Sequence, residues 1–403
     1  MAKIKNTFLF ILYTAILGAI VGAIIWIFLR LMNLGINLIW EKVPSALNFP
    51  FYTLLLCAIG GLLIGLWKRK FGNYPDELNE VLGKVKKTGR YPYNNVFSIS
   101  GSALFPLLLG ASVGPEAGLT GIIAGLCTWV GDKLKHFSNE LKELTKIGIS
   151  ATLGTIFHSP MFGFMEPLEE DKKTVLPKKS KIVLYFTAIL SSFGIFWLLN
   201  KIFGVHTGIE GLGPANIELH DYLYAVPLCA VGILLGYFFM LSRKLTQIIF
   251  KPIKDKIVLT CAIGGLLLGI SGTVLPLTMF SGEHQISQVA ESAPSFGIAV
   301  LLITAAVKLI LTNICITSGL KGGHFFPVIF CGICVGFSIS LITGIDAVFC
   351  SGIVTTALIA HTLKKPLAAV LLMMIVFPVH LIPIMLFSAF AANIFKTPKF
   401  LAE

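Results

Sequence analysis

The sequence predicts an all-α polytopic membrane protein, and three observations support this fold class. The 403 residues have a hydrophobic fraction of 55% and a mean hydropathy of +0.85. Only 13% of the residues are charged, whereas a soluble domain carries about 25%. No polar stretch is long enough for a second, soluble domain. We therefore expect a single transmembrane domain over residues 1–403, placed in the cell membrane with the lipid bilayer as its solvent.

The charge-free runs that mark the predicted spans differ in length. They cover 6–29, 43–67, 91–115, 117–131, 182–200, 222–242, 257–282, 292–307, 322–345, 347–363 and 366–395. A straight membrane helix needs about 20 residues, so some runs are too short, and others are longer with Gly or Pro breaks. We therefore expect tilted, re-entrant and half-spanning helices. Broken backbone is tolerated in a membrane where it is buried or lines a polar pathway, which favours a transport protein.

The charge distribution predicts the orientation. The net charge of +12 comes from basic residues in short loops, such as Lys68–Lys70 and Lys84–Lys87, as in the cytoplasmic loops of membrane proteins. We therefore expect the N-terminus and residues 68–90 in the cytoplasm, and no nucleic-acid partner. We also expect no cofactor and no metal, because Cys331 and Cys334 form one CxxC without a second pair.

The motif GASVGPEAGLTGIIAG at 110–125 carries a single acid, Glu116, in an otherwise charge-free stretch. A carboxylate there costs several kcal/mol unless it faces a cavity or a partner, so it indicates a functional site. Pro115 suits the first turn of a helix, which we expect to run toward Lys133. The N-terminus of that helix would face an anion, or Glu116 would occupy the place of one. The alternative is a capping acid at the membrane surface.

A second motif, SGLKGGHFFPVIFCGICVG at 318–336, predicts another helix start after Gly323. The first N–H groups, from His324 to Phe326, are donors for an anion. Phe325 and Phe326 could close the pathway, or they could contact lipid or core. His324 could titrate, although a lone histidine is more often structural.

A third motif, FHSPMFGFMEPLEED at 157–171, ends an apolar helix with three acids, Glu166, Glu169 and Glu170. They could receive protons, or they could form a solvated helix end that pairs with the following lysines.

A weak internal repeat connects these motifs. GPEAG at 114–118 is followed by ATLGTIFHSP at 151–160, and GGHFFP at 322–327 is followed by ALIAHTLKKP at 357–366. Paired halves with interrupted helices indicate a secondary transporter with its site at the repeat interface. We place the halves at roughly 50–200 and 220–400; chance similarity of apolar segments is the alternative.

Together the three motifs resemble the CLC family of chloride channels and proton-coupled exchangers. GASVGPEAG is similar to the glycine-rich motif of the family's gating glutamate, and GGHFFP to its G-x-F-x-P motif. The segment 157–171 resembles the helix that ends in two glutamates. The motifs occur in the family's order, and the resemblance covers roughly residues 5–400.

The resemblance implies a homodimer with one anion pathway per subunit, built from an inverted repeat of tilted and half-spanning helices. Glu116 matches the external gating glutamate and Glu170 the internal proton-transfer glutamate. The backbone amides at His324 and Phe325, flanked by Gly323 and Phe326, match those that hold the central anion.

Two departures from the family pattern concern anion binding. In FGNYP at 71–75, Gly72 stands beside Asn73 where the family has an anion-binding Ser. Phe400 stands where it has a pore Tyr. A site without these hydroxyl donors is expected to hold chloride weakly. Fluoride-type members also depart at the Ser motif, but no residue here selects fluoride.

We therefore predict transport of chloride or a similar small anion, coupled to protons through Glu116. The alternatives are a passive anion channel and a fluoride-selective exchanger. An intramembrane enzyme is disfavoured, because the sequence has no HExxH motif and its candidate aspartates, Asp132 and Asp346, are lone residues at span ends. A cation carrier using Glu116 is disfavoured because glycine-bounded helix N-termini attract anions.

Overall fold

The computed structural model describes residues 2–47, 49–93, 95–133, 141–166, 169, 179–204, 211–398 and 400–401. Within these ranges the backbone forms helices joined by short connections, and Gly114 and Gly323 pair in an isolated antiparallel β-bridge. This confirms the all-α prediction. In the described part of the chain, six helical segments are long and apolar enough to cross a membrane: Leu9–Ala46, Ile182–Phe203, Leu219–Ile253, Ile257–Val274, Ile298–Ser318 and Phe325–Thr343.

The chain divides into two compact units. The first comprises Met1–Asn37, Tyr74–Leu104 and Pro115–Gly208, and the second comprises Leu38–Asn73, Phe105–Gly114 and Ile209–Glu403. Helix α5 (Val96–Leu108) begins in the first unit and ends in the second. The repeat boundaries expected from the sequence, 50–200 and 220–400, stay a prediction.

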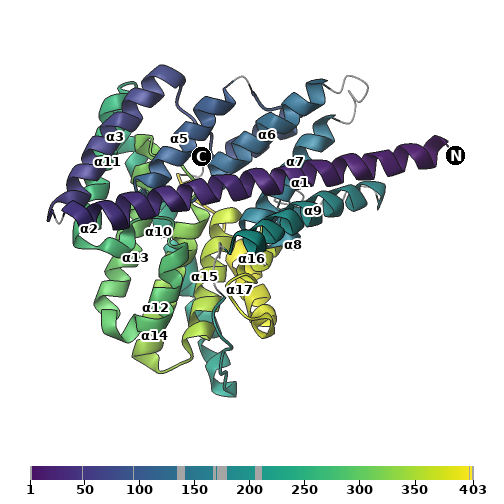
Figure 1. Ribbon diagram of the computed structural model, residues 1–403. Helices are drawn as coiled ribbons and strands as arrows, with labels where there is room; N and C mark the ends of the chain where they lie inside the picture. The colour runs from purple at the N-terminus through teal and green to yellow at the C-terminus, as the bar shows by residue number, and fades with distance from the viewer. Residues whose placement is uncertain are drawn as a thin grey trace. The chain divides into compact units, whose positions relative to one another are not determined.

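Helix α1 packs lengthwise on α9 in the first unit (Figure 1). The helices of this unit are α1 (Ala2–Asn37), α4 (Leu78–Thr88), α6 (Glu116–Lys133), α7 (Leu141–Ile156), α8 (Pro160–Met165) and α9 (Lys179–Phe203). A Cβ atom on Gly18 or Gly22 would lie 2.2 Å from the carbonyl oxygen of Ala188 or Ser192, respectively. Small residues four positions apart therefore allow the two helices to approach closely, as is common in membranes.

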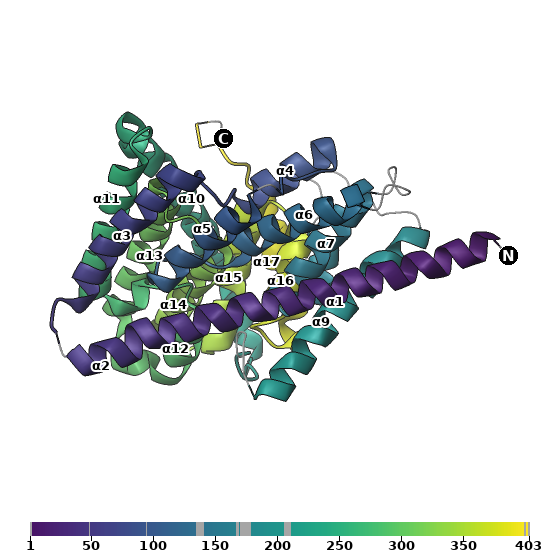
Figure 2. The same cartoon turned by 45° about the horizontal axis from the view of Figure 1, so that its top comes forward.

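The second unit pairs α3 with α11 in the same way (Figure 2). Its helices are α2 (Val43–Leu47), α3 (Tyr52–Phe71), α10 (Ala225–Phe250), α11 (Ile257–Val274), α12 (Glu283–Phe296), α13 (Ile298–Ser318), α14 (Phe325–Thr343), α15 (Ala347–Leu363), α16 (Pro366–Met373) and α17 (Ile382–Ile394). A Cβ on Gly265 would lie 2.3 Å from the Cys57 carbonyl oxygen, and one on Gly61 2.5 Å from the Cys261 carbonyl oxygen. These glycines bring the two backbones into contact.

The predicted repeat is visible in the local structure of each unit. Helices α6, α7 and α8 follow one another in the first unit as α14, α15 and α16 do in the second. Both α8 and α16 begin at a proline, Pro160 or Pro366. Two residues before each proline the backbone is left-handed, at His158 (φ 48°) and at Lys364 (φ 57°). The matched sequence segments therefore form matched helix–turn–helix elements.

The charge-free runs do not coincide with the helices in several of the predicted spans, and two of them show why. The run 292–307 ends too early, because α13 continues through the charged Lys308 to Ser318. The run 43–67 joins two helices, α2 and α3, that are separate in the structure. A buried charge does not end a helix when its partners are supplied, and an apolar run does not prevent a turn.

We predict that Gly265→Leu destabilises the protein, because the added side chain has no space between α3 and α11. Overpacking typically costs about 1–3 kcal/mol, and here the clash is with backbone. The measurement is the thermal unfolding midpoint of detergent-purified protein. Gly194→Leu is the matched control, because a Cβ on Gly194 meets nothing within 4 Å. Equal midpoints for the two variants would contradict the packing described.

Candidate functional site

Helix α6 begins at Glu116, as the sequence predicts, and the Glu116 side chain is fully buried. Gly118 lets α6 pack closely on α5, because a Cβ there would lie 2.4 Å from the Cβ of Ala103. The Thr120 hydroxyl donates to the Glu116 carbonyl oxygen at 2.6 Å. A carboxyl group at a helix N-terminus is favoured by the helix dipole, so the position suits a negative charge or a site for one.

The two glycine motifs meet at a pair of reciprocal hydrogen bonds. The Gly114 N–H donates to the Gly323 carbonyl oxygen at 2.8 Å, and the Gly323 N–H donates to the Gly114 carbonyl oxygen at 2.8 Å. A Cβ on Gly322 would lie 2.5 Å from Val113 Cγ2, so the pairing needs a residue without a side chain there. Glu116 follows Gly114 by two residues, and His324 follows Gly323 directly.

Helix α14 begins immediately after this glycine pair. His324 is its N-cap residue, and Phe325 and Phe326 are buried in its first turn. The His324 ring stacks on Phe239 and Phe325, with centroid distances of 5.6 and 4.8 Å. The first N–H groups of a helix point away from its own hydrogen-bond ladder and attract anions. The predicted helix start is thus confirmed, and its two phenylalanines belong to the core.

Four hydrogen bonds anchor the segment 105–114 that leads to the glycine pair. They are Trp40 Nε1 to the Leu108 oxygen at 2.9 Å, Cys57 Sγ to the Leu109 oxygen at 3.6 Å, the Phe280 N–H to the Gly110 oxygen at 2.9 Å, and the Ser112–Thr312 hydroxyl pair at 3.0 Å. The four partners come from four different places in the second unit: the π-helical turn Leu38–Lys42, α3, the turn after α11 and α13. The non-helical backbone after Leu108 is thereby supplied with partners.

Lys308 is a buried charge that the sequence reasoning overlooked. Its Nζ donates to the carbonyl oxygens of Leu277, Met279 and Phe280 at 3.0, 2.8 and 3.0 Å. It also lies 4.9 Å from the ring centroid of Phe330. Like Glu116, Lys308 is a lone charged residue in an apolar run of the sequence, so the same pattern marks both positions.

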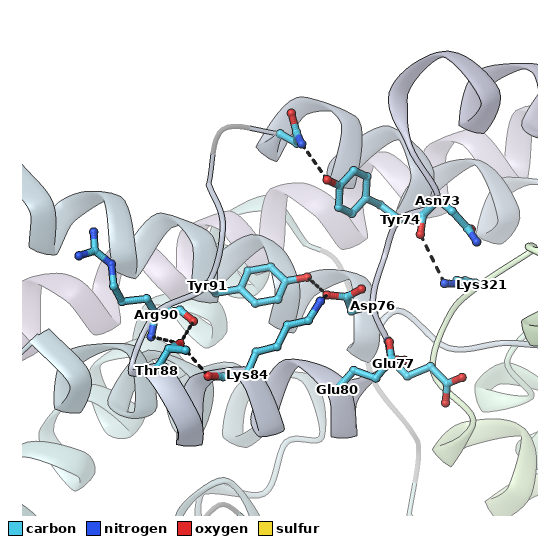
Figure 3. Close-up of polar contacts among 11 residues, drawn as sticks. Asn73, Tyr74, Asp76, Glu77, Glu80, Lys84, Thr88, Arg90, Tyr91 and Lys321 are labelled. Atoms are coloured by element: carbon cyan, nitrogen blue, oxygen red, sulfur yellow. Dashed lines mark hydrogen bonds and ion pairs between the residues drawn. The ribbon is translucent and has the colours of Figure 1, made fainter. Parts of the chain in front are cut away.

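Gly72 and Asn73 form the loop that ends α3. Gly72 has a φ of 102°, and its N–H donates to the Lys68 carbonyl oxygen at 2.8 Å. Lys68 Nζ donates to Asn73 Oδ1 at 3.5 Å. Lys321 Nζ donates to the Asn73 carbonyl oxygen at 3.4 Å (Figure 3). Because Lys321 is two residues before Gly323, the structure places Asn73 near the second motif.

The next part of the chain belongs to the first unit and has its own polar network (Figure 3). The Tyr91 hydroxyl donates to Asp76 Oδ2 at 2.8 Å, and Lys84 forms an ion pair with the same carboxylate. Asn95 Nδ2 donates to the Tyr74 hydroxyl oxygen at 2.7 Å. These contacts fix the turn before α5.

The other predicted site residues differ in burial, and one of them is outside the described part of the chain. Glu170 lies outside the described residues, whereas Glu166 and Glu169 are both buried. Phe400 is 67% exposed, so its ring does not lie in a buried pocket. Among the described residues, no group of three or more His, Cys, Asp or Glu side chains is placed to hold a metal ion.

The fold is that of a polytopic α-helical membrane protein, and it is similar to the fold of solved CLC-type proteins. A solved CLC-type fluoride/proton antiporter superposes with a TM-score of 0.77 at 17% identity, over 96% of this chain and 94% of the other. A slow cyanobacterial Cl⁻/H⁺ antiporter superposes with a TM-score of 0.78 at 18% identity, over 96% and 93%. At these identities the likeness concerns the fold.

The sequence comparisons define the family. The profile described as "Voltage gated chloride channel" matches residues 60–397, so the chain belongs to that family. The curated "Putative ion-transport protein YfeO" of Escherichia coli O17:K52:H18 is 22% identical over 330 residues, which is 79% of this chain and 76% of the relative. The chain is therefore a multi-pass membrane protein of CLC-type anion transport, a family of transporters and not of enzymes.

We predict that Lys308→Met lowers the thermal unfolding midpoint, because three carbonyl oxygens lose one charged donor. A hydrogen bond to a charged group contributes roughly 1.5–3 kcal/mol, and buried acceptors left unsatisfied are costly. Lys244→Met, at an exposed position on α10, is the control and should change little. An unchanged or raised midpoint for Lys308→Met would mean that the cost of burying the ammonium group outweighs its hydrogen bonds.

Proposed function

We propose that the protein exchanges a small inorganic anion for protons across the cell membrane and that Glu116 is its gate. The observation that carries the proposal is the buried Glu116 carboxyl at the start of α6, two residues after the Gly114–Gly323 pair. A carboxyl group in an apolar membrane helix is expensive and marks ion or proton pathways. Glu116 is the single acid in the sequence stretch 110–125.

In the proposed mechanism the anion binds to backbone N–H groups at the start of α14. His324 and Phe325 supply the amides, and Gly323 and Phe326 flank them. Ionised Glu116 competes with the anion, because both carry negative charge and both are attracted to helix N-termini. A proton on the carboxyl removes that charge, so the neutral side chain no longer competes and the anion enters. Each cycle of Glu116 thus moves protons and anions in opposite directions.

The transported anion is chloride or fluoride in this proposal. The two antiporters of similar fold are a Cl⁻/H⁺ and a fluoride/proton antiporter, with TM-scores of 0.78 and 0.77, so fold similarity does not favour either anion. Gly72 offers no hydroxyl to the anion, and its positive φ of 102° opposes a serine there.

The inner end of the proton path is assigned to Glu170, with Glu166 as the neighbouring acid. The proposal also includes a homodimer and a cytoplasmic N-terminus, both expected from the sequence. If no inner acid relays protons, the same anion pathway operates as a passive channel. The buried Glu166 favours a relay, because a solvated helix end would expose its carboxylates.

We predict that Glu116→Gln abolishes proton movement driven by an anion gradient, while anion movement continues. Glutamine cannot ionise, so it neither carries a proton nor competes as an anion. Proton and anion fluxes are measured in proteoliposomes, with chloride and fluoride in parallel. Glu291→Gln, at an exposed position on α12, should retain wild-type coupling. Coupled transport in Glu116→Gln would overturn the gate assignment.

We predict that Glu170→Gln reduces proton flux and leaves anion flux intact, because the inner relay is lost. The same vesicle assay is applied to Glu166→Gln. If Glu166→Gln abolishes proton flux and Glu170→Gln does not, the relay belongs to Glu166. Normal proton flux in the double variant would mean that neither acid is the relay.

A further inference from the structure

An apolar groove lies between three helices of the first unit. Its walls are side chains of α1 from Tyr13 to Ile24, side chains of α6 from Ile123 to Val130, and Leu144 of α7, and its volume is about 230 Å³. Helix α1 passes α6 and α7 in this region (Figures 1 and 2). An apolar cavity stays dry and takes up apolar molecules, so the walls favour an apolar occupant over an ion or a polar ligand.

The walls of the groove have the length of one leaflet of a bilayer. At 1.5 Å per residue, the lined part of α1, from Tyr13 to Ile24, is about 17 Å long. Helix α6 from Ile123 to its last residue, Lys133, is about 15 Å long. The hydrocarbon core of a bilayer is about 30 Å thick, so each leaflet contributes about 15 Å. The groove therefore fits a lipid acyl chain, whereas a membrane-spanning partner helix is about twice as long.

One end of the groove lies beside charged residues. Trp129 lines the groove and is 45% exposed, and Lys133 follows it by one helical turn on the same face of α6. Asp132 forms an ion pair with Arg90, so two basic residues and one acid gather at the end of α6. Tryptophan is enriched at the level of the lipid headgroups. The groove therefore leads from hydrocarbon depth to a positively charged rim at the membrane surface.

We propose that this groove binds one acyl chain of an anionic phospholipid, whose headgroup lies at Lys133. The apolar walls bind the chain, and the positive rim favours a negatively charged headgroup. In the orientation predicted from the sequence, Arg90 faces the cytoplasm, and the cytoplasmic leaflet carries the anionic lipids. The inference goes beyond the proposed anion transport, because the groove begins about two helical turns after Glu116 and its occupant is not transported.

Two isoleucines of α1 provide a matched test of the groove. Ile20 lines it and is 50% exposed, whereas Ile27 is 51% exposed outside it. Native mass spectrometry of detergent-purified protein measures the Kd of added phosphatidylglycerol. We expect Ile20→Trp to raise this Kd about tenfold, because the indole displaces roughly two CH₂ groups of the chain. Ile27→Trp should stay within about twofold of wild type.

Two outcomes of this comparison would overturn the proposal. The first is an equal phosphatidylglycerol affinity of Ile20→Trp and Ile27→Trp. The second is a changed oligomeric state of Ile20→Trp with unchanged lipid affinity, because the groove would then be an interface between copies of the chain.

The headgroup assignment is tested at Lys133. Phosphatidylethanolamine with the same acyl chains is the reference lipid, because its headgroup has no net charge. We expect Lys133→Gln to raise the phosphatidylglycerol Kd about fivefold and to leave the phosphatidylethanolamine Kd within about twofold. Lys254→Gln, at an exposed position after α10, should keep the wild-type preference. An unchanged preference for phosphatidylglycerol in Lys133→Gln would contradict the binding of an anionic lipid at this rim.

Fluorescence quenching tests the proposal without filling the groove. A phosphatidylglycerol brominated on its acyl chains quenches tryptophan on contact, and Trp129 lines the groove. At one lipid per protein in detergent, we expect wild-type protein to be quenched and Trp129→Phe to lose most of that quenching. Trp197→Phe, at an exposed position on α9, is the control and should retain it. Equal quenching of wild type and Trp129→Phe would overturn the proposal even if Ile20→Trp fails to fold.

Discussion

The reciprocal hydrogen bonds between Gly114 and Gly323 are the contact on which the arrangement of the second unit's key segments depends. Two stretches of non-helical backbone lie inside an apolar protein, and their polar groups cannot be left without partners. By pairing with each other they satisfy a donor and an acceptor on each side. The pairing holds Gly323 directly before the N-cap residue of α14. It also holds Gly114, from which the chain continues to Glu116.

The same requirement explains the buried polar side chains nearby. Lys308 supplies three donors to the turn after α11, and the N–H of Phe280 in that turn supplies one to Gly110. Thr312, one helical turn after Lys308, contacts Ser112. Helix α13 therefore supports the segment that leads to the gate, through a charged side chain at one turn and a hydroxyl at the next. A membrane protein can break its helices at a functional site only if such partners are present.

In the proposed pathway the anion is attracted by helix N-termini and backbone amides, without a side-chain hydroxyl from the loop after α3. Helix N-termini and backbone amides attract anions without regard to their identity, and the loop after α3 offers no hydroxyl at Gly72. In the proposed mechanism, ionised Glu116 competes with the anion for this positive field, and a proton on the carboxyl ends that competition.

The sequence by itself determined the fold class, the starts of α6 and α14, and the matched breaks at Pro160 and Pro366. These features depend on local chemistry, namely apolar length, helix-starting Pro and Gly, and the cost of a lone acid in a membrane span. Only the tertiary structure decided that α13 continues through Lys308, that the Ser112 hydroxyl meets Thr312, and that Asn73 lies beside Lys321. These contacts join residues tens to hundreds of positions apart, and no local pattern encodes them. A charged residue marks the end of a membrane helix when its side chain is solvated. Lys308 lies within α13 because three carbonyl oxygens from another part of the chain accept its hydrogen bonds, and only the tertiary structure brings them there.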